Sequence, residues 1–278
     1  MQYRRLGKSG LQVSAFSFGS WVTFAKQVDI APAKDMMAAA YDAGINFFDN
    51  AEGYEQGRSE LVMGQAIDEL GWSRDSFAVS SKVFWGGQKP MQRGLSAKHV
   101  TDACNAALKR LRVDYLDLYF CHRPDVDTPI EETVRAMHHL IAQGKVLYWG
   151  TSEWSAQQIT EAHVVAGRWG LTPPTMEQPQ YNLFERDKVE DYGRRKGWNA
   201  VLIDIYNSGL YTEEEIANLK AENGNEEAWN REFLCMFTGS VGGAYYNNII
   251  NDLANMEKIG PYPYNRSLPV ITAWDLGL

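Results

Sequence analysis

Two spacings of apolar residues alternate along residues 1–182. Short apolar or β-branched runs predict strands. Residues 2–21 predict a hairpin followed by a strand, and further strands are predicted at 46–49, 77–85, 115–122, 146–152 and 175–182. Between these runs, apolar residues recur at intervals of three and four. They predict amphipathic helices from near 32, over 60–70, around 100–111, over 130–144 and after 155. This alternation is typical of a parallel sheet covered by helices.

Two arrangements of a parallel sheet fit the pattern: an open doubly wound sheet and a closed (β/α)8 barrel. No G-x-G-x-x-G follows the first predicted strand, so the dinucleotide fingerprint of the open sheet is absent. In a barrel the carboxyl ends of all strands converge on one mouth, and the predicted strands end on side chains suited to such a mouth. These are Trp21, Asp49, Lys82, His122, Ser152 and Gln178. We therefore favour an α/β fold of the (β/α)8, TIM-barrel type.

The stretch NFFDNAEGY at 46–54 carries the clearest chemistry, because it places Asp49 and Tyr54 five residues apart across a turn. A tyrosine with a pKa of about 10 is a poor proton donor at neutral pH, and a nearby ammonium group lowers that pKa. Lys82 would supply the ammonium group and Asp49 would orient it. His122 would hold a substrate oxygen or assist proton transfer. The set predicts protonation of an alkoxide as it forms, which carbonyl reduction by hydride requires.

Each of these residues has an ordinary interpretation when taken alone. A strand-end aspartate is usually a turn or cap residue, a single lysine is usually solvated, and a single histidine is usually a satisfied surface or core group. Their joint placement on successive strand ends favours the catalytic interpretation. The remaining histidines fall on predicted helices, and we interpret them as outer-face residues: His99, His138, His139 and His163.

Composition narrows the class of protein. The chain of 278 residues has 45% hydrophobic and 22% charged residues, which is ordinary for a soluble globular protein. Its net charge of −8 argues against nucleic-acid binding. No apolar run approaches the ~18 residues of a membrane span, and MQYRRLGKSG lacks the apolar core of a signal peptide. Cys104, Cys121 and Cys235 predict free buried thiols in a cytoplasmic protein.

A series of motifs, in this order, resembles the aldo-keto reductase superfamily: FGSWVTF, FFDNAEGY, SKVFWGG, YFCHRPD, TPIEETVRAM, YWGTSEWS and EQPQYN. They are most similar to the branch that contains the voltage-gated potassium-channel β subunits and their bacterial relatives. The resemblance covers residues 1 to about 192. It implies a (β/α)8 barrel that binds NADPH at its mouth without a Rossmann fold.

The resemblance also assigns roles to the strand-end residues. Its tetrad falls on Asp49, Tyr54, Lys82 and His122. Tyr54 would be the general acid and Lys82 the group that tunes its pKa. Asp49 would orient Lys82, and His122 would position the substrate. Channel β subunits carry Asn at the position of His122, so the chain looks more like the enzymatic members.

Cofactor and substrate positions follow from the same motifs. The implied cofactor-binding residues are Ser20, Trp21, Gln27, Asp49, Ser152 and Gln178. Ser152 and Gln178 would hold the nicotinamide carboxamide, and Trp85 would line the substrate pocket beside His122. Glu153 stands where the channel-β branch often has Arg.

Beyond Tyr192 the resemblance stops. In the family, a seventh strand with a W/Y-S-P-L loop and an eighth strand with basic residues clamp the cofactor phosphates, and neither is recognisable in this sequence. We therefore predict an incomplete barrel of six family strands over 1–192. A second segment over 193–278 would be a fused or chimeric piece.

Residues 193–278 instead resemble a fragment of large terminase subunits of tailed phages, through KGWNAVLIDIYNSGLYTEEEI, NREFLCMFTGSVGGAYY and ITAWDLGL. This resemblance implies a metal-binding carboxylate at Asp275. The chain has no G-x-x-x-x-G-K-[ST] phosphate loop, and a nuclease needs at least two clustered carboxylates. We expect the segment to be inactive. A helix is predicted from Thr212, and strand-like 199–207 and 268–276 are candidates to cover open barrel edges.

The sequence therefore predicts an NADP-dependent oxidoreductase that reduces small aldehydes or ketones to alcohols and needs no metal. Its activity is expected to be impaired by the missing phosphate-binding loops. The alternative is a non-catalytic regulatory subunit of the potassium-channel β type that binds nicotinamide nucleotide. A third hypothesis, an inactive terminase fragment, concerns the last segment only. A homo-oligomer is a further expectation.

Overall fold

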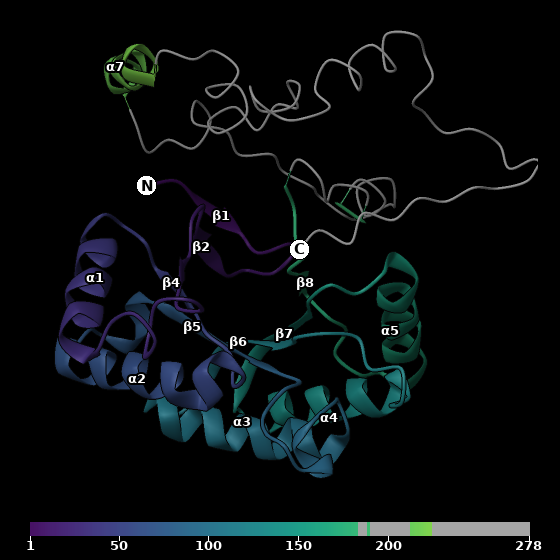
Figure 1. Cartoon of the computed structure of the whole chain (residues 1–278). Coiled ribbons are helices and arrows are strands. Elements are labelled where there is room, and N and C mark those ends of the chain that lie inside the picture. The colour runs from purple at the N-terminus through teal and green to yellow at the C-terminus, as the bar shows by residue number, and fades with distance from the viewer. Residues whose placement is uncertain (183–187, 190–211, 224–278) are drawn as a thin grey trace, which may run out of the picture.

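The computed structural model describes residues 1–182, 188–189 and 212–223. Within them, six parallel strands form one sheet in which each strand pairs with the next one in the chain. These strands are β3 (Phe18–Gly19), β4 (Phe47–Asp49), β5 (Ala78–Val83), β6 (Leu116–Cys121), β7 (Val146–Thr151) and β8 (Met176–Glu177). The strand order never reverses, so the switch point of a doubly wound sheet is absent from the described part. The sheet curls as an incomplete (β/α)8 barrel, which confirms the predicted fold class (Figure 1).

Helices between successive strands cover the outer face of this sheet (Figure 1). They are α1 (Ile30–Asp42), α2 (Arg58–Leu70), α3 (Ala97–Leu111), α4 (Ile130–Ala142) and α5 (Ala156–Trp169). The predicted apolar stripe of α3 is buried against the strands, and Ser96 caps the helix by accepting a hydrogen bond from the His99 backbone N–H (3.3 Å). Ser155 caps α5 in the same way through the Gln158 N–H.

Side chains alternate between the two faces of each strand, and this alternation creates two cores. Phe48, Val79, Tyr119 and Trp149 face the helices and belong to the large outer core. A smaller inner core contains Phe47, Ala78, Leu118, Phe120 and Met176 on the opposite face. Residues in phase with this second set, further along each strand, point toward the inside of the barrel at its carboxyl end.

An antiparallel hairpin of β1 (Tyr3–Arg5) and β2 (Gln12–Ser14) packs against the inner core through Val13, Leu6 and Leu11. It is anchored at the amino end of the sheet. The backbone N–H of Ser14 donates to the side chain of Asn46, just before β4 (2.7 Å). The predicted opening hairpin is thereby confirmed, and it occupies the end opposite to the strand-end polar residues.

The last predicted elements have different outcomes. Strand β8 has two residues, whereas the sequence predicted a strand over 175–182, because Pro179 has no N–H to continue the ladder. The helix predicted from Thr212 is present as α7 (Glu213–Asn223), and Thr212 caps it by accepting from the Glu215 N–H (3.3 Å). The strands predicted over 199–207 and 268–276, Cys235 and Asp275 lie outside the described residues. Cys104 and Cys121 are free and buried, as predicted.

Candidate active site

A buried ion pair joins β4 and β5 at the carboxyl end of the sheet. The Lys82 Nζ lies 2.5 Å from the Asp49 Oδ2 and also donates to the Asn50 backbone carbonyl (2.9 Å). The other Asp49 oxygen accepts a hydrogen bond from Ser80 (2.6 Å). Lys82 is 1% exposed and Asp49 is 8% exposed. Because each charge is buried with its partner and with further hydrogen bonds, the ammonium group is held in one place.

Tyr54 completes a row of three groups. It begins a short 3-10 turn, η1 (Tyr54–Gly57), and its hydroxyl lies 3.2 Å from the Lys82 Nζ. Glu55 and Gln56, which follow it, have left-handed φ angles of 47° and 56°, so the turn after Tyr54 is tight. The predicted meeting of Asp49, Lys82 and Tyr54 therefore exists in the structure.

The Tyr54 pKa is shifted in the opposite sense to the predicted lowering. Burial is the largest influence on it and raises the pKa above its ordinary value, while the Lys82 charge and hydrogen bond lower it only in part. The sequence argument counted the lysine and could not count the desolvation of the phenolate. Tyr54 is consequently a protonated phenol at neutral pH, which is the form that can donate a proton.

His122 follows β6 and lies beside the phenol. Its ring centroid is 5.6 Å from that of Tyr54, with the rings edge to face. Burial, with the Lys82 and Arg123 charges, lowers the His122 pKa to about 3, so the imidazole is neutral at physiological pH. Its Nδ1 is buried and accepts or donates no hydrogen bond within the described part of the chain. A neutral imidazole carries one N–H donor, which is suited to hold a ligand oxygen.

Two tryptophans form the rim of this group. Trp21 is 68% exposed and stacks on the Tyr54 ring at 6.2 Å between centroids. Trp85 is 37% exposed and lies 5.0 Å from the His122 ring. The structure thus brings both sequence-predicted aromatic residues to the same mouth as the four acid–base residues.

The predicted cofactor residues occupy different settings. Ser152 and Gln178 lie side by side after β7 and β8, where the Ser152 hydroxyl donates to the Gln178 carbonyl (2.9 Å). Ser20 is fully buried and its hydroxyl donates to the Asp49 carbonyl (3.0 Å), so it joins β3 to β4. Gln27 is exposed and lines a hollow near the start of α2 with Arg58 among its neighbours.

Glu177 precedes Gln178 and gives a prediction for the pH dependence of stability. Burial raises its pKa from 4.5 to about 7, although its carboxylate accepts from the Trp154 backbone N–H (3.1 Å) and the Thr151 hydroxyl. The folded state therefore binds more protons than the unfolded state between pH 4.5 and 7, and stability falls as pH rises through this window. In wild type we expect the free energy of unfolding to fall by about 1–3 kcal/mol between pH 5 and 8 because of Glu177. The Glu177→Gln variant should lack this fall.

The measurement is urea unfolding of both proteins at pH 5 and pH 8. Glutamine keeps an acceptor for Trp154 and gains a donor for Thr151, so its folded geometry is preserved. Parallel pH dependence in the two proteins would contradict the expectation.

Three residues of this region were missed or misread from the sequence. Glu52 is buried, accepts from the Phe84 N–H (2.7 Å) and lies 3.3 Å from the His99 Nε2. His99 is 3% exposed and also contacts the Gly94 carbonyl through Nδ1 (2.8 Å). Its interpretation as an outer-face residue was wrong, because it lies on the same stripe of α3 as Ala103 and Ala107. Through these contacts Glu52, in the loop that precedes Tyr54, is tied to the first turn of α3 by His99 and to the segment after β5 by Phe84.

Arg123 is the third missed residue. It directly follows His122 in YFCHRPD, the motif that identified the histidine. This position beside a predicted site residue was the feature of the sequence that could have indicated it. Its guanidinium lies 5.2 Å from the centre of the Trp85 ring.

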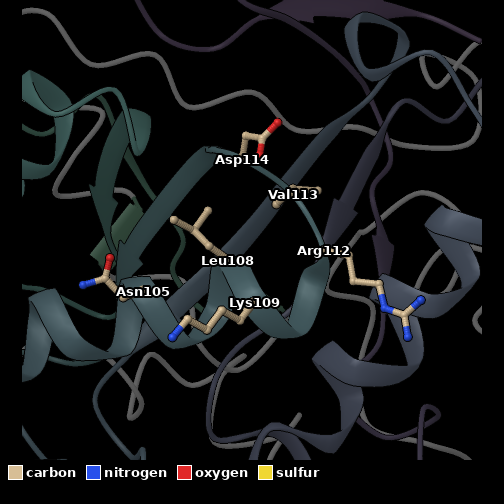
Figure 2. A pocket seen from close by; sticks show the side chains of 6 residues that line it. All are labelled: Asn105, Leu108, Lys109, Arg112, Val113 and Asp114. Carbon is tan, nitrogen blue, oxygen red and sulfur yellow. The ribbon is translucent and has the colours of Figure 1, made fainter.

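Another hollow lies away from the acid–base residues. Figure 2 shows the side chains that line a hollow at the last turns of α3 and the loop before β6. The volume of this hollow is about 600 Å³. It is lined by Asn105, Leu108, Lys109, Arg112, Val113 and Asp114. Because Asp114 precedes β6, this hollow lies at the amino end of the strands, and none of the acid–base residues lines it.

Two absences concern only the residues that the structure describes. Within 1–182, 188–189 and 212–223, no helix is both long and apolar enough to cross a membrane. Over the same ranges, no group of three or more His, Cys, Asp or Glu side chains is placed to hold a metal ion.

The curled parallel sheet and the strand-end tetrad define a class of protein, and the comparison with known families agrees. The chain belongs to the aldo/keto reductase family, whose profile matches residues 15–268. Two similar curated proteins, from Arabidopsis thaliana and Oryza sativa subsp. japonica, are each named a probable voltage-gated potassium channel subunit beta. Each is 58% identical to this chain over 190 residues, which are 68% of this chain and 58% of the relative.

The chain thus spans 58% of the length of these curated relatives. The family match continues past residue 192, whereas the alignments with the relatives cover 190 residues. The division at 192 and the terminase resemblance of 193–278 stay predictions.

Proposed function

We propose that this chain is an NADPH-dependent oxidoreductase that reduces aldehydes or ketones to alcohols. The observation that carries the proposal is the buried row from Asp49 through Lys82 to the Tyr54 hydroxyl, which ends beside the neutral imidazole of His122. Such a row is suited to giving one proton to an oxygen that becomes negatively charged. Membership of the aldo/keto reductase family supports it.

The mouth has features that fit a nicotinamide nucleotide. Gln178, beside Ser152 at the strand ends, is partly exposed, so its side-chain amide is available to a ligand at the mouth. Ser152 and Gln178 would hold the carboxamide, with Ser20, Trp21, Gln27 and Asp49 as the further binding residues carried by the motifs. When bound, the reduced nucleotide would supply the hydride.

The residues of the chain would act on the substrate oxygen. His122 would hold the carbonyl oxygen through its ring, and Tyr54 would donate its proton to that oxygen as negative charge develops. Lys82 would stabilise the phenolate left on Tyr54, because its Nζ lies 3.2 Å from the phenol oxygen. Asp49 would keep the ammonium group charged and in position. Trp21 and Trp85 would exclude water from the reacting atoms.

A second candidate function rests on the names of the two relatives. A regulatory subunit of a voltage-gated potassium channel would bind the nucleotide and a partner protein without a need for turnover. The two functions share the nucleotide and differ in catalysis, so one set of measurements separates them.

The test is a titration of the full chain with NADPH, followed by tryptophan fluorescence, and then an assay of 4-nitrobenzaldehyde reduction at 340 nm. We expect saturable quenching of Trp21 and Trp85 and measurable oxidation of NADPH. Saturable binding without turnover would favour the regulatory candidate. No saturable change would eliminate both functions for this chain.

A further inference from the structure

Arg123 and Trp85 form one wall of the mouth next to His122. The Arg123 guanidinium donates to the His122 carbonyl oxygen (2.6 Å) and lies over the Trp85 ring, with its central carbon 5.2 Å from the ring centre. The Trp85 ring is itself 5.0 Å from the imidazole. A cation on an aromatic face is therefore adjacent to the group that would hold the carbonyl oxygen.

The charge of Arg123 stands out because the other nearby cations are paired. Lys82 is 2.5 Å from Asp49, and Lys188 is 2.5 Å from Glu153. Among the ion pairs of the described residues, none includes Arg123, whose side chain is half-buried. The Arg123 charge also acts electrostatically on the Glu153 carboxylate, which is the ion-pair partner of Lys188. Arg123 itself has no ion-pair partner among the described residues, so it adds positive charge to this part of the mouth, although the whole chain carries −8.

We propose that Arg123 and Trp85 form a subsite for a carboxylate attached to a flat apolar body, so that the preferred substrates are carbonyl compounds carrying a carboxylate. The inference rests on the proposed function, since it places the reacting carbonyl at His122. A guanidinium binds a carboxylate through two parallel N–H donors, and the exposed face of Trp85 can stack with a planar group. Recognition would be by charge and by stacking together.

The test compares two aldehydes that differ in charge: 4-carboxybenzaldehyde and its neutral methyl ester. We expect the full wild-type chain, with NADPH, to reduce the acid with the higher kcat/KM. The ratio of kcat/KM for acid over ester should fall about tenfold or more in Arg123→Met, because a charge-assisted contact to the carboxylate is lost. The ratio for Arg123→Lys should lie between those of wild type and Arg123→Met, because lysine keeps the charge without the planar guanidinium.

Arg135→Met is the matched control, because Arg135 also lies over a tryptophan, Trp169, at 4.7 Å, on α4 away from the mouth. Its ratio should equal that of wild type. An unchanged ratio in Arg123→Met would overturn the proposal. If the ratio stays unchanged while the Kd for NADPH rises, Arg123 belongs to the nucleotide site.

If the wild-type chain reduces neither aldehyde, the proposed function is refuted but the carboxylate subsite is not. A separate binding measurement then tests the subsite. Benzoate binding is then measured by tryptophan fluorescence in wild type, Arg123→Met and Arg135→Met. We expect saturable binding that is weakened about tenfold only in Arg123→Met. Equal binding in all three proteins, or none in any, would overturn the subsite.

Discussion

Replacing Tyr54 with phenylalanine is expected to lower the rate of aldehyde reduction about 10²- to 10⁴-fold while NADPH still binds. The substitution removes only the hydroxyl that lies 3.2 Å from the Lys82 Nζ. The aromatic ring remains against Trp21 and His122, so the shape of the mouth is kept. The measurement is kcat/KM for 4-nitrobenzaldehyde, together with the Kd for NADPH from tryptophan fluorescence.

Tyr119→Phe is the matched control for this substitution. Tyr119 is fully buried on the outer face of β6, where its hydroxyl donates to the Val100 carbonyl (3.2 Å). Loss of this hydrogen bond should lower the free energy of unfolding by about 1 kcal/mol and leave turnover unchanged. Equal rates in wild type and Tyr54→Phe would show that another group supplies the proton.

Replacing Lys82 with methionine is expected to lower the free energy of unfolding by about 3–5 kcal/mol and to abolish turnover. The change leaves the Asp49 carboxylate buried with Ser80 as its remaining side-chain partner, so a charge stays in the interior without its counterion. It also removes the ammonium group that would stabilise the Tyr54 phenolate. Urea unfolding and the aldehyde assay measure the two effects.

Two further variants test the cause of this loss. The double variant Asp49→Asn, Lys82→Met should recover much of the stability, because no unpaired charge remains, and should stay inactive. Lys98→Met removes one member of an exposed pair, Lys98–Asp102, and should change stability by about 0.5 kcal/mol or less. If Lys82→Met proved as mild as Lys98→Met, the buried pair would not support the fold as we argue.

The sequence predicted the site well wherever strand alternation alone decides the position of a side chain. Asp49 is in phase with Phe47, and Lys82 with Ala78, so the inner face of each strand leads directly to the polar residue at its carboxyl end. The absence of a glycine fingerprint and the polar residues at the strand ends were enough to select a barrel over a doubly wound sheet. These are local features, and a sequence contains them in full.

Properties that depend on three-dimensional surroundings could not be predicted in the same way. The raised pKa of Tyr54 results from the desolvation of the phenol by residues that are distant in sequence. The burial of His99 had a local signal, its position on the apolar stripe of α3, but its partner Glu52 comes from another loop. The charge of Arg123 became notable only after the other cations at the mouth were found in ion pairs.

The order of strands in the sheet has a consequence for synthesis of the chain on the ribosome. Each strand from β4 to β8 pairs with the one made just before it, so the sheet can grow at one edge as residues emerge. Asp49, Tyr54, Lys82 and His122 all precede residue 123 and lie on, or directly after, the neighbouring strands β4, β5 and β6. These four side chains can therefore come together before the last 86 residues, 193–278, have been translated.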